Sequence, residues 1–158
     1  MIGEVATVRL PEASDTFEFG RRLGGSLAPG DLVLLAGPLG AGKTVLAKGI
    51  AAGLGVLGRV SSPTFIIARE HRPAPGGRGI PLVHVDAYRL GALDELDDLD
   101  LDTELVDAVL VVEWGEGMAE RLSEDHLLIR LEPVEDEVRL ATVIPHGAWE
   151  SRDWLVAL

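Results

Sequence analysis

The segment GPLGAGKT, residues 37–44, follows the pattern G-x-x-x-x-G-K-S/T. Glycines in this pattern let backbone N–H groups approach phosphate oxygens closely, and the following helix presents its positive end to the same anion. Lys43 is expected to reach the β- and γ-phosphates of a nucleotide, and the Thr44 hydroxyl to bind Mg²⁺. The predicted nucleotide-binding residues are Gly37, Gly40, Ala41, Gly42, Lys43, Thr44 and Val45.

Two apolar runs end in a carboxylate, PLVHVD at Asp86 and VLVVE at Glu113. We expect both runs to be strands, and ligands of open α/β sheets bind at the carboxyl ends of the strands. Magnesium prefers oxygen ligands, and a second carboxylate can orient or deprotonate an attacking water. We therefore expect Thr44 and Glu113 at the metal and Asp86 beside the γ-phosphate or its water, although Asp86 and Glu113 could exchange roles. The predicted catalytic residues are Lys43, Asp86 and Glu113.

The base that accompanies the phosphates is inferred from what the chain lacks. Guanine-specific switch proteins usually read the base with an N-K-x-D segment. This chain has no Asn, and neither of its two lysines is followed two residues later by Asp. ATP is therefore the favoured nucleotide, with Mg²⁺ as its metal cofactor. No residue pattern reads adenine directly, and a residue near the first helix, such as Thr16, is a candidate for the base site.

Strand-like segments dominate the chain. Unbroken apolar runs such as DLVLLAG predict strands buried on both faces, and pairs joined by Pro- and Gly-rich turns predict hairpins. The segment RPAPGGRG should connect one such pair, and the last two strands should form a C-terminal antiparallel pair. The predicted strands are residues 4–10, 31–37, 63–71, 80–90, 109–116, 126–133 and 137–145.

Helices are predicted before and after the loop. Ser14 is a plausible N-cap for a helix that continues to residue 27, and Gly55 should end a helix over residues 43–54. A short amphipathic helix is predicted over residues 148–158. The predicted fold class is therefore α/β, like that of P-loop NTPases, with a parallel central sheet and flanking antiparallel strands.

Length and charge narrow the function further. The chain of 158 residues, 1–158, is predicted to form one domain. It carries 14 basic and 26 acidic residues, a formal charge of −12 and a pI of about 4.6. Sequence-independent binding to nucleic acid needs a basic footprint, so any contact with RNA is expected mostly through a partner protein.

Disulfide and membrane functions are not expected. The chain has no cysteine, which excludes disulfides and thiol chemistry. The N-terminal residues do not resemble a signal peptide, and no apolar run reaches membrane-spanning length. We therefore expect a cytoplasmic protein without a membrane partner.

Three further segments follow the loop in order: SPTF at residues 62–65, HVDAYRL at 84–90 and VEWGE at 112–116. With these segments the chain resembles the TsaE family, the bacterial P-loop ATPases of tRNA threonylcarbamoyladenosine biosynthesis. The resemblance extends from about Asp15 to Glu116, and beyond it only the antiparallel ending is similar. The loop alone would fit very many proteins, whereas the four blocks together are specific.

The resemblance implies that ATP hydrolysis by this chain supports a complex of two proteins, TsaD and TsaB. That complex transfers a threonylcarbamoyl group to the adenosine next to the anticodon of tRNA. TsaE is expected to reset or remodel the complex between turnovers without transferring the group itself. Contact with tRNA would then be indirect, through the complex.

Site residues also follow from the resemblance by position. Lys43 and Thr44 match the family's phosphate and magnesium residues, and Glu113 matches its magnesium-site glutamate. Asp86 matches the acid of the histidine-x-aspartate-x-tyrosine-arginine block. Thr64 lies where a switch-like threonine would sense the γ-phosphate.

Two more positions complete the comparison with the family pattern. Trp114 matches the family tryptophan beside the site. Pro38 is a departure, because the family usually has an acidic residue after the first glycine of the loop. Phosphate binding should survive this change, since the position is variable in the loop pattern, but any role of an acid there is in doubt.

Two other functions stay open from the sequence. A small-molecule or nucleoside kinase shares the loop and the chain length, but it usually needs a mobile lid with arginines aimed at the transferred phosphate. Arg121 and Arg130 follow the VEWGE segment, and Arg130 lies in a predicted strand, so no lid is evident. A nucleotide-binding regulator without turnover is also compatible with the sequence.

Several residues have both a structural and a functional interpretation. His84 is predicted to be a buried core histidine in preference to a ligand. The acidic segment 94–107, with eight carboxylates, is either a solvated helical face or a docking surface for a basic partner. Arg89 either pairs with nearby acids or contacts phosphate or a partner. Trp149 and Trp154 are predicted to pack in the core or in a lid.

Overall fold

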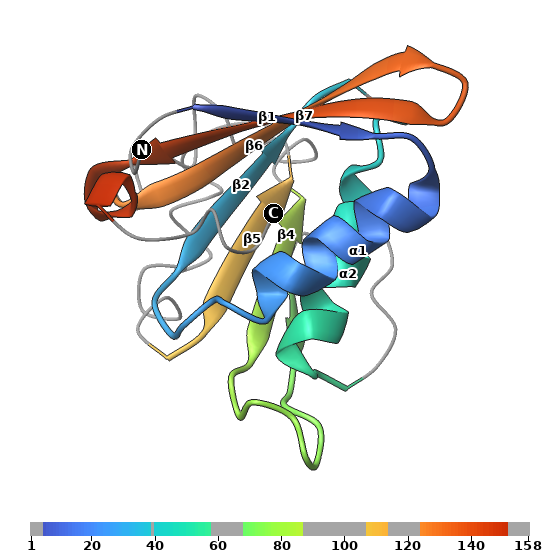
Figure 1. The fold of residues 1–158 in the computed structure, drawn as a ribbon. Helices are drawn as coiled ribbons and strands as arrows, with labels where there is room; N and C mark the ends of the chain where they lie inside the picture. The colour runs from blue at the N-terminus through green and yellow to red at the C-terminus, as the bar shows by residue number, and fades with distance from the viewer. Residues whose placement is uncertain (1–4, 39, 58–67, 87–106, 114–123, 152–158) are drawn as a thin grey trace.

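The computed structural model describes residues 5–38, 40–57, 68–86, 107–113 and 124–151. Its strands are β1 (Ala6–Leu10), β2 (Leu32–Ala36), β3 (Ala68–His71), β4 (Leu82–Asp86), β5 (Val109–Glu113), β6 (His126–Glu135) and β7 (Val138–His146). The α-helices are α1 (Ala13–Gly24) and α2 (Lys43–Leu54), and a 3-10 helix spans Gly147–Ser151. Among the described residues the strands form one seven-stranded sheet (Figure 1).

The centre of this sheet is parallel and its margins are antiparallel. The strand order is β1-β7-β6-β2-β5-β4-β3, and the neighbours β6, β2, β5 and β4 run parallel to one another. At one margin β7 is antiparallel to both β6 and β1, and at the other β3 is antiparallel to β4. The predicted fold class is confirmed, including the C-terminal antiparallel pair. Strand β6 also belongs to the parallel centre, because β2 is its other neighbour.

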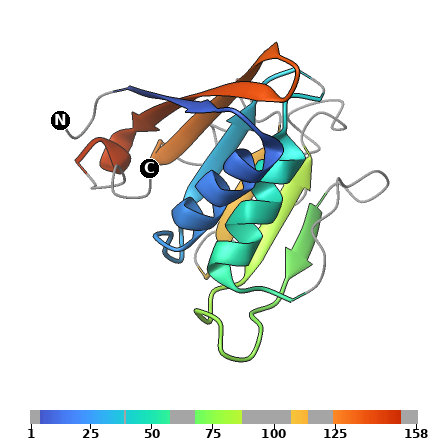
Figure 2. The ribbon, with the colours of Figure 1, turned by 45° about the vertical axis from the view of Figure 1, so that its right-hand side comes forward.

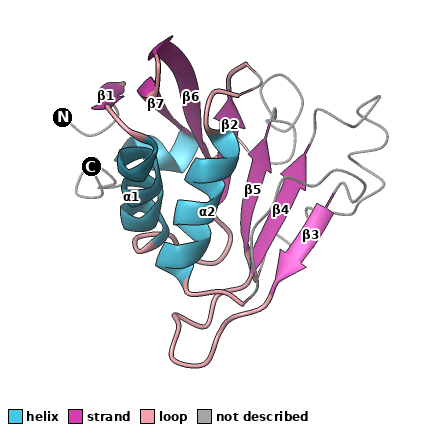
Figure 3. Ribbon diagram, turned by 90° about the vertical axis from the view of Figure 1, so that its right-hand side faces the viewer, coloured by secondary structure: helices cyan, strands magenta, loops and turns pink. Residues whose placement is uncertain are grey.

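Both α-helices lie against the same face of the sheet (Figure 3). Their apolar side chains share one core with the strands, in which Leu46 and Ile50 of α2 pack with Val33 and Val111 of the sheet. Strands β2 and β5 are buried at every residue, as their unbroken apolar runs predict. Trp149 also belongs to this core, which confirms its predicted packing role.

The predicted bounds of the first helix are wrong. Helix α1 begins at Ala13, one residue before the predicted N-cap Ser14, because the Asp15 carboxylate accepts the backbone N–H of Glu12 at 2.9 Å. It ends at Gly24, because the hydroxyl and the N–H of Ser26 both donate to the Leu23 carbonyl and close the last turn. The predicted helix over residues 148–158 is a 3-10 helix as far as Ser151, and residues 152–158 lie outside the described part.

Helices α1 and α2 lie side by side at a backbone distance that only glycine permits (Figure 2). A Cβ on Gly20 or Gly24 would collide with the carbonyl oxygen of Leu46 or Ile50 in α2. A Cβ on Gly49 or Gly53 would collide in turn with the backbone of α1. Since α2 begins at the GPLGAGKT loop, this packing fixes α1 relative to the loop.

Gly49→Ala should lower the free energy of unfolding by about 2 kcal/mol or more, because the added methyl group must push α1 away. Intrinsic helix propensity alone would favour Ala by up to about 1 kcal/mol, so the sign of the change separates the two effects. Gly25→Ala is the matched control, since Gly25 has φ −66° and its Cβ would meet only ordinary contacts. Urea unfolding of the three chains measures the difference. A Gly49→Ala chain as stable as the original would contradict the close packing.

Candidate functional site

The GPLGAGKT loop connects the buried strand β2 to the first turn of α2. Gly42 precedes α2 with φ +101°, a left-handed conformation that favours glycine. Gly37, with φ +142°, lies so close to β6 that a Cβ would collide with the Leu131 carbonyl oxygen. Because β6 lies beside β2, position 37 has room only for glycine. This contact explains why the first residue of the G-x-x-x-x-G-K-S/T pattern is a glycine here.

Lys43 lies across the inside of the loop. Its side chain is buried, with 4% exposure, and its Nζ donates to the carbonyl oxygens of Gly37 and Pro38 at 2.8 Å each. The Pro38 oxygen also accepts the Ala41 N–H at 3.1 Å. The lysine ammonium group is therefore held at the loop, where a bound phosphate group would meet a positive charge.

Three polar side chains form a chain of contacts behind the loop. The Thr44 hydroxyl donates to Oε1 of Glu113 at 3.4 Å, and the other carboxylate oxygen, Oε2, lies 2.5 Å from Nε2 of His84. Glu113 is 4% exposed and His84 is completely buried. The carboxylate of Glu113 thus connects the loop hydroxyl to a buried imidazole. The structure brings Thr44 and Glu113 together, while their assignment to the metal stays a prediction.

His84 is buried as predicted, but it contacts a site residue and is not merely part of the core. His84 is in register with Val111, which lies two residues before Glu113 on β5, so His84 and Glu113 share one face of the sheet. Nδ1 of His84 has no hydrogen-bond partner among the described residues. The tautomer with its proton on Nε2 therefore suits the site, because that proton is donated to the carboxylate.

The oxygen atoms of Thr44 and Glu113 suit Mg²⁺. Magnesium commonly keeps several waters and takes one or two protein carboxylates together with substrate phosphates. No group of three or more His, Cys, Asp or Glu side chains gathers into a metal cage within the described residues. A hydroxyl and a single carboxylate beside a phosphate-binding loop therefore fit magnesium carried by a nucleotide better than a protein-only cage.

Asp86 is the last residue of β4, and its Cα is paired with that of Glu113. Glu113 is also in register with Leu35 of β2, one residue before the end of that strand. The two predicted acids therefore end neighbouring parallel strands at the edge of the sheet where the loop begins. This backbone arrangement agrees with the prediction, whereas the division of roles between the acids stays a prediction.

Thr16 of α1 lies beside the start of α2. A Cβ on Gly42 would be 3.9 Å from the Thr16 methyl carbon, and Thr16 is only 1% exposed. Its hydroxyl has no hydrogen-bond partner among the described residues. The structure thus brings Thr16 next to the loop, while its assignment to the base site stays a prediction.

Other sequence predictions fall on residues outside the described part. These are Thr64 and the SPTF segment, Arg89, Trp114, Arg121, Trp154 and residues 94–106 of the acidic segment. Their predicted roles are not tested by the structure.

Sequence reasoning also missed one residue that contacts the loop. Arg139, near the start of β7, donates to the carbonyl oxygens of Gly40 and Ala41. In the sequence Arg139 stood only in a predicted C-terminal antiparallel pair of strands. Nothing in that pattern indicates a contact across 98 positions of the chain.

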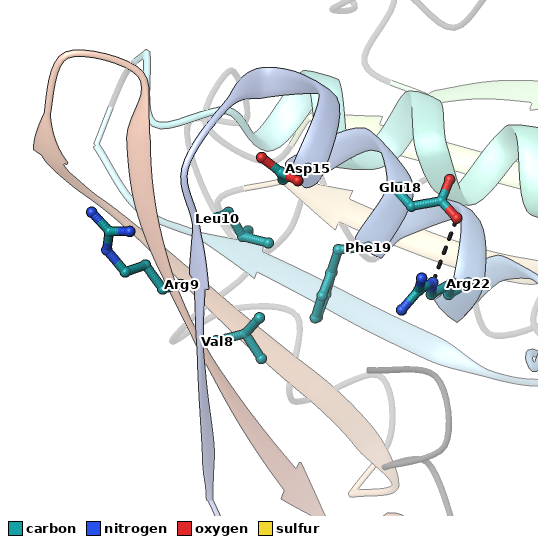
Figure 4. A pocket seen from close by; sticks show the side chains of 7 residues that line it. All are labelled: Val8, Arg9, Leu10, Asp15, Glu18, Phe19 and Arg22. Carbon is teal, nitrogen blue, oxygen red and sulfur yellow. Dashed lines mark ion pairs between the residues drawn. The ribbon is translucent and has the colours of Figure 1, made fainter.

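A separate hollow of about 160 Å³ lies between β1 and α1 (Figure 4). Leu10 and Phe19 line it, and Glu18 and Arg22 form an ion pair at its rim, with 3.5 Å between Oε1 and Nε. Its lining includes none of the predicted site residues. We therefore assign the candidate site to the loop and the adjoining strand ends.

The parallel strand β2, the glycine-rich loop and helix α2 define a P-loop nucleotide-binding protein. A family model described as "Threonylcarbamoyl adenosine biosynthesis protein TsaE" matches residues 10–141. The chain belongs to the TsaE family.

Individual relatives agree with this assignment. The tRNA threonylcarbamoyladenosine biosynthesis protein TsaE of Mycobacterium tuberculosis is 57% identical over 143 residues, which cover 86% of this chain and 84% of the relative. The protein of the same name from Streptomyces coelicolor is 56% identical over 142 residues, covering 86% and 95%. The crystal structure of YdiB from Bacillus subtilis matches with a TM-score of 0.74 and 30% identity over 96% of this chain and 91% of that one. No helix in the described part is long and apolar enough to cross a membrane.

Replacing His84 by Leu should lower the free energy of unfolding by about 1–3 kcal/mol, because the buried Glu113 carboxylate loses a hydrogen-bond partner. The single variants His84→Leu and Glu113→Leu and the double variant form a double-mutant cycle. The double variant should cost less than the sum of the single ones, since neither polar group is then buried without its partner. Urea unfolding of the four chains measures the coupling, and strictly additive costs would show that the two side chains do not interact.

Proposed function

We propose that this chain is a Mg²⁺-dependent ATPase that acts as an accessory subunit in tRNA threonylcarbamoyladenosine biosynthesis. The pathway is that of its family. Hydrolysis of ATP would support turnover of a complex of TsaD and TsaB. That complex would transfer the threonylcarbamoyl group to the adenosine next to the anticodon. The cytoplasmic location expected from the sequence belongs to the same proposal.

The observation that best supports ATP hydrolysis is the contact chain from Thr44 through Glu113 to His84 beside the loop. In this proposal Lys43 contacts the β- and γ-phosphates, and the Thr44 hydroxyl and the Glu113 carboxylate hold magnesium. Bound magnesium would neutralise charge that develops on the phosphate oxygens. Asp86, which ends the neighbouring strand, is proposed to orient the attacking water.

The charge of the chain supports an indirect role at tRNA. With a formal charge of −12, the protein lacks the excess of basic residues that holds a nucleic-acid backbone. We therefore propose that TsaD and TsaB hold the tRNA and that this chain acts on them. The acidic segment 94–107 stays a candidate docking surface for such a partner.

The comparisons do not favour a kinase. The relatives described above carry the name of a tRNA threonylcarbamoyladenosine biosynthesis protein. Arg130, one of two arginines considered for a lid, lies within β6 as predicted. A kinase would in addition need an acceptor pocket, and the hollow between β1 and α1 does not include the loop.

ATP turnover by the isolated chain should be slow and should rise at least about tenfold with TsaD, TsaB and tRNA, because a residue supplied in trans is worth roughly 10³–10⁵ in P-loop switches. The assay counts phosphate released and modified tRNA per complex, with each partner omitted in turn. Many modifications per complex in the presence of this chain would support the accessory role. An ATP turnover rate that is the same with and without the partners, with no gain in modified tRNA, would contradict the accessory role and favour the kinase hypothesis.

Glu113→Gln should lower ATP turnover about 100-fold while the Kd for ATP changes less than about threefold, because a neutral amide holds magnesium poorly and leaves the loop intact. Glu124→Gln, which removes a charge from an exposed position just before β6, is the matched control and should behave like the original chain. Phosphate release and calorimetric titration measure the two quantities. A loss of binding as large as the loss of turnover would overturn the assignment of Glu113 to the metal.

A further inference from the structure

The guanidinium group of Arg139 connects the β6–β7 hairpin to the GPLGAGKT loop. Its Nε donates to the Ala41 carbonyl oxygen at 3.1 Å, and its Nη2 donates to that of Gly40 at 3.3 Å. Its Nη1 donates to the carbonyl oxygens of Asp136 and Val138, at 2.7 and 3.1 Å, inside the hairpin itself. One side chain therefore holds four carbonyl groups from two distant segments.

Arg139 and Lys43 divide the carbonyl groups of the loop between them. Lys43 donates to the carbonyl oxygens of Gly37 and Pro38 from the inside of the loop. Arg139 donates to those of Gly40 and Ala41. A carbonyl oxygen carries partial negative charge and would repel a phosphate group if it turned inward. Arg139 thus holds the Gly40 and Ala41 oxygens toward the hairpin, while the positive charge of Lys43 offsets the partial negative charge of the Gly37 and Pro38 oxygens.

The peptide between Ala41 and Gly42 shows the consequence for the donors. No described peptide bond is cis, and in a trans peptide the C=O and N–H groups point in opposite directions. The bond from Arg139 to the Ala41 oxygen therefore turns the Gly42 N–H to the other side of the loop. This N–H adjoins the first turn of α2, and the N-terminal end of a helix favours an anion.

The sheet explains why Arg139 is in this position. Its Cα is paired with Leu10 of β1 on one side and with Pro133 of β6 on the other. Its hairpin turns at Asp136, which has φ +46°. The hairpin reaches the same end of the molecule as the loop (Figure 1). The antiparallel margin of the sheet, through Arg139 of β7, thus supplies hydrogen bonds to the Gly40 and Ala41 carbonyl oxygens of the loop.

We propose that Arg139 is a positioning residue that holds the loop in its phosphate-binding shape and thereby sets nucleotide affinity. This inference rests on the proposed nucleotide binding, and it assigns no chemistry to Arg139 itself. Arginine suits the role better than lysine, because its planar group offers several donors in a fixed fork. The effect should appear in binding and in the order of the free loop, whereas turnover of bound nucleotide should hardly change.

Arg139→Met should weaken the binding of ADP about tenfold and leave turnover at saturating ATP within about twofold, because ground-state positioning acts before the chemical step. Arg139→Lys, which keeps the charge and loses the fork, should show an intermediate Kd. Without nucleotide, backbone amides of residues 37–44 should exchange faster in Arg139→Met than in the original chain. Calorimetry with ADP, steady-state kinetics and hydrogen exchange provide the three readouts.

Arg9→Met is the matched control, since Arg9 lies on the adjoining strand β1, is exposed and has no polar contact among the described residues. It should bind ADP like the original chain. Equal affinities of Arg139→Met and the original chain, or an equal loss in Arg9→Met, would overturn the inference and leave the proposed function standing. If Arg139→Met does not fold, unchanged affinity in Arg139→Lys overturns it. Failure of the original chain to bind ADP or ATP would overturn both proposals.

Discussion

The backbone of residues 37–44 has to satisfy two opposed demands, and much of the described structure serves them. Its N–H groups must face a common centre, while its carbonyl oxygens need partners elsewhere. Lys43 and Arg139 together provide partners for four of these oxygens. Leu131 in β6 leaves no room for a side chain on Gly37. The loop is therefore shaped by its own lysine, by the neighbouring parallel strand and by an arginine from the antiparallel margin.

Two further constraints connect the loop to the rest of the fold. The glycine-lined contact between α1 and α2 places Thr16 beside the loop. The two helices are so close that any side chain at these glycines would collide with the backbone of the other helix. The register of β4 and β5 places His84 on the same face as Glu113, so the carboxylate that faces Thr44 is also held from behind. A single buried carboxylate thus connects the loop to the packing of the sheet.

The sequence predicted the fold class, the strand–loop–helix unit and the end of α2 at Gly55, because each follows from local pattern and glycine chemistry. It also predicted that Thr44 and Glu113 meet. It missed the contact of Arg139 with the loop, because that contact depends on which strands become neighbours at long sequence separation. It placed His84 in the core but not beside Glu113, since strand register is invisible in a single apolar run. The predicted start of α1 was wrong because the Asp15 carboxylate caps the helix at Glu12, two positions before the predicted N-cap Ser14.

The central claim is that this loop binds one nucleotide with its magnesium, and calorimetric titration of the isolated chain with ATP tests it most directly. The account predicts saturable binding of one ATP per chain, stronger with Mg²⁺ than without it, weaker for GTP and lost in Lys43→Ala. Absence of saturable binding, or a Lys43→Ala chain that binds ATP as well as the original, would contradict the assignment of the site.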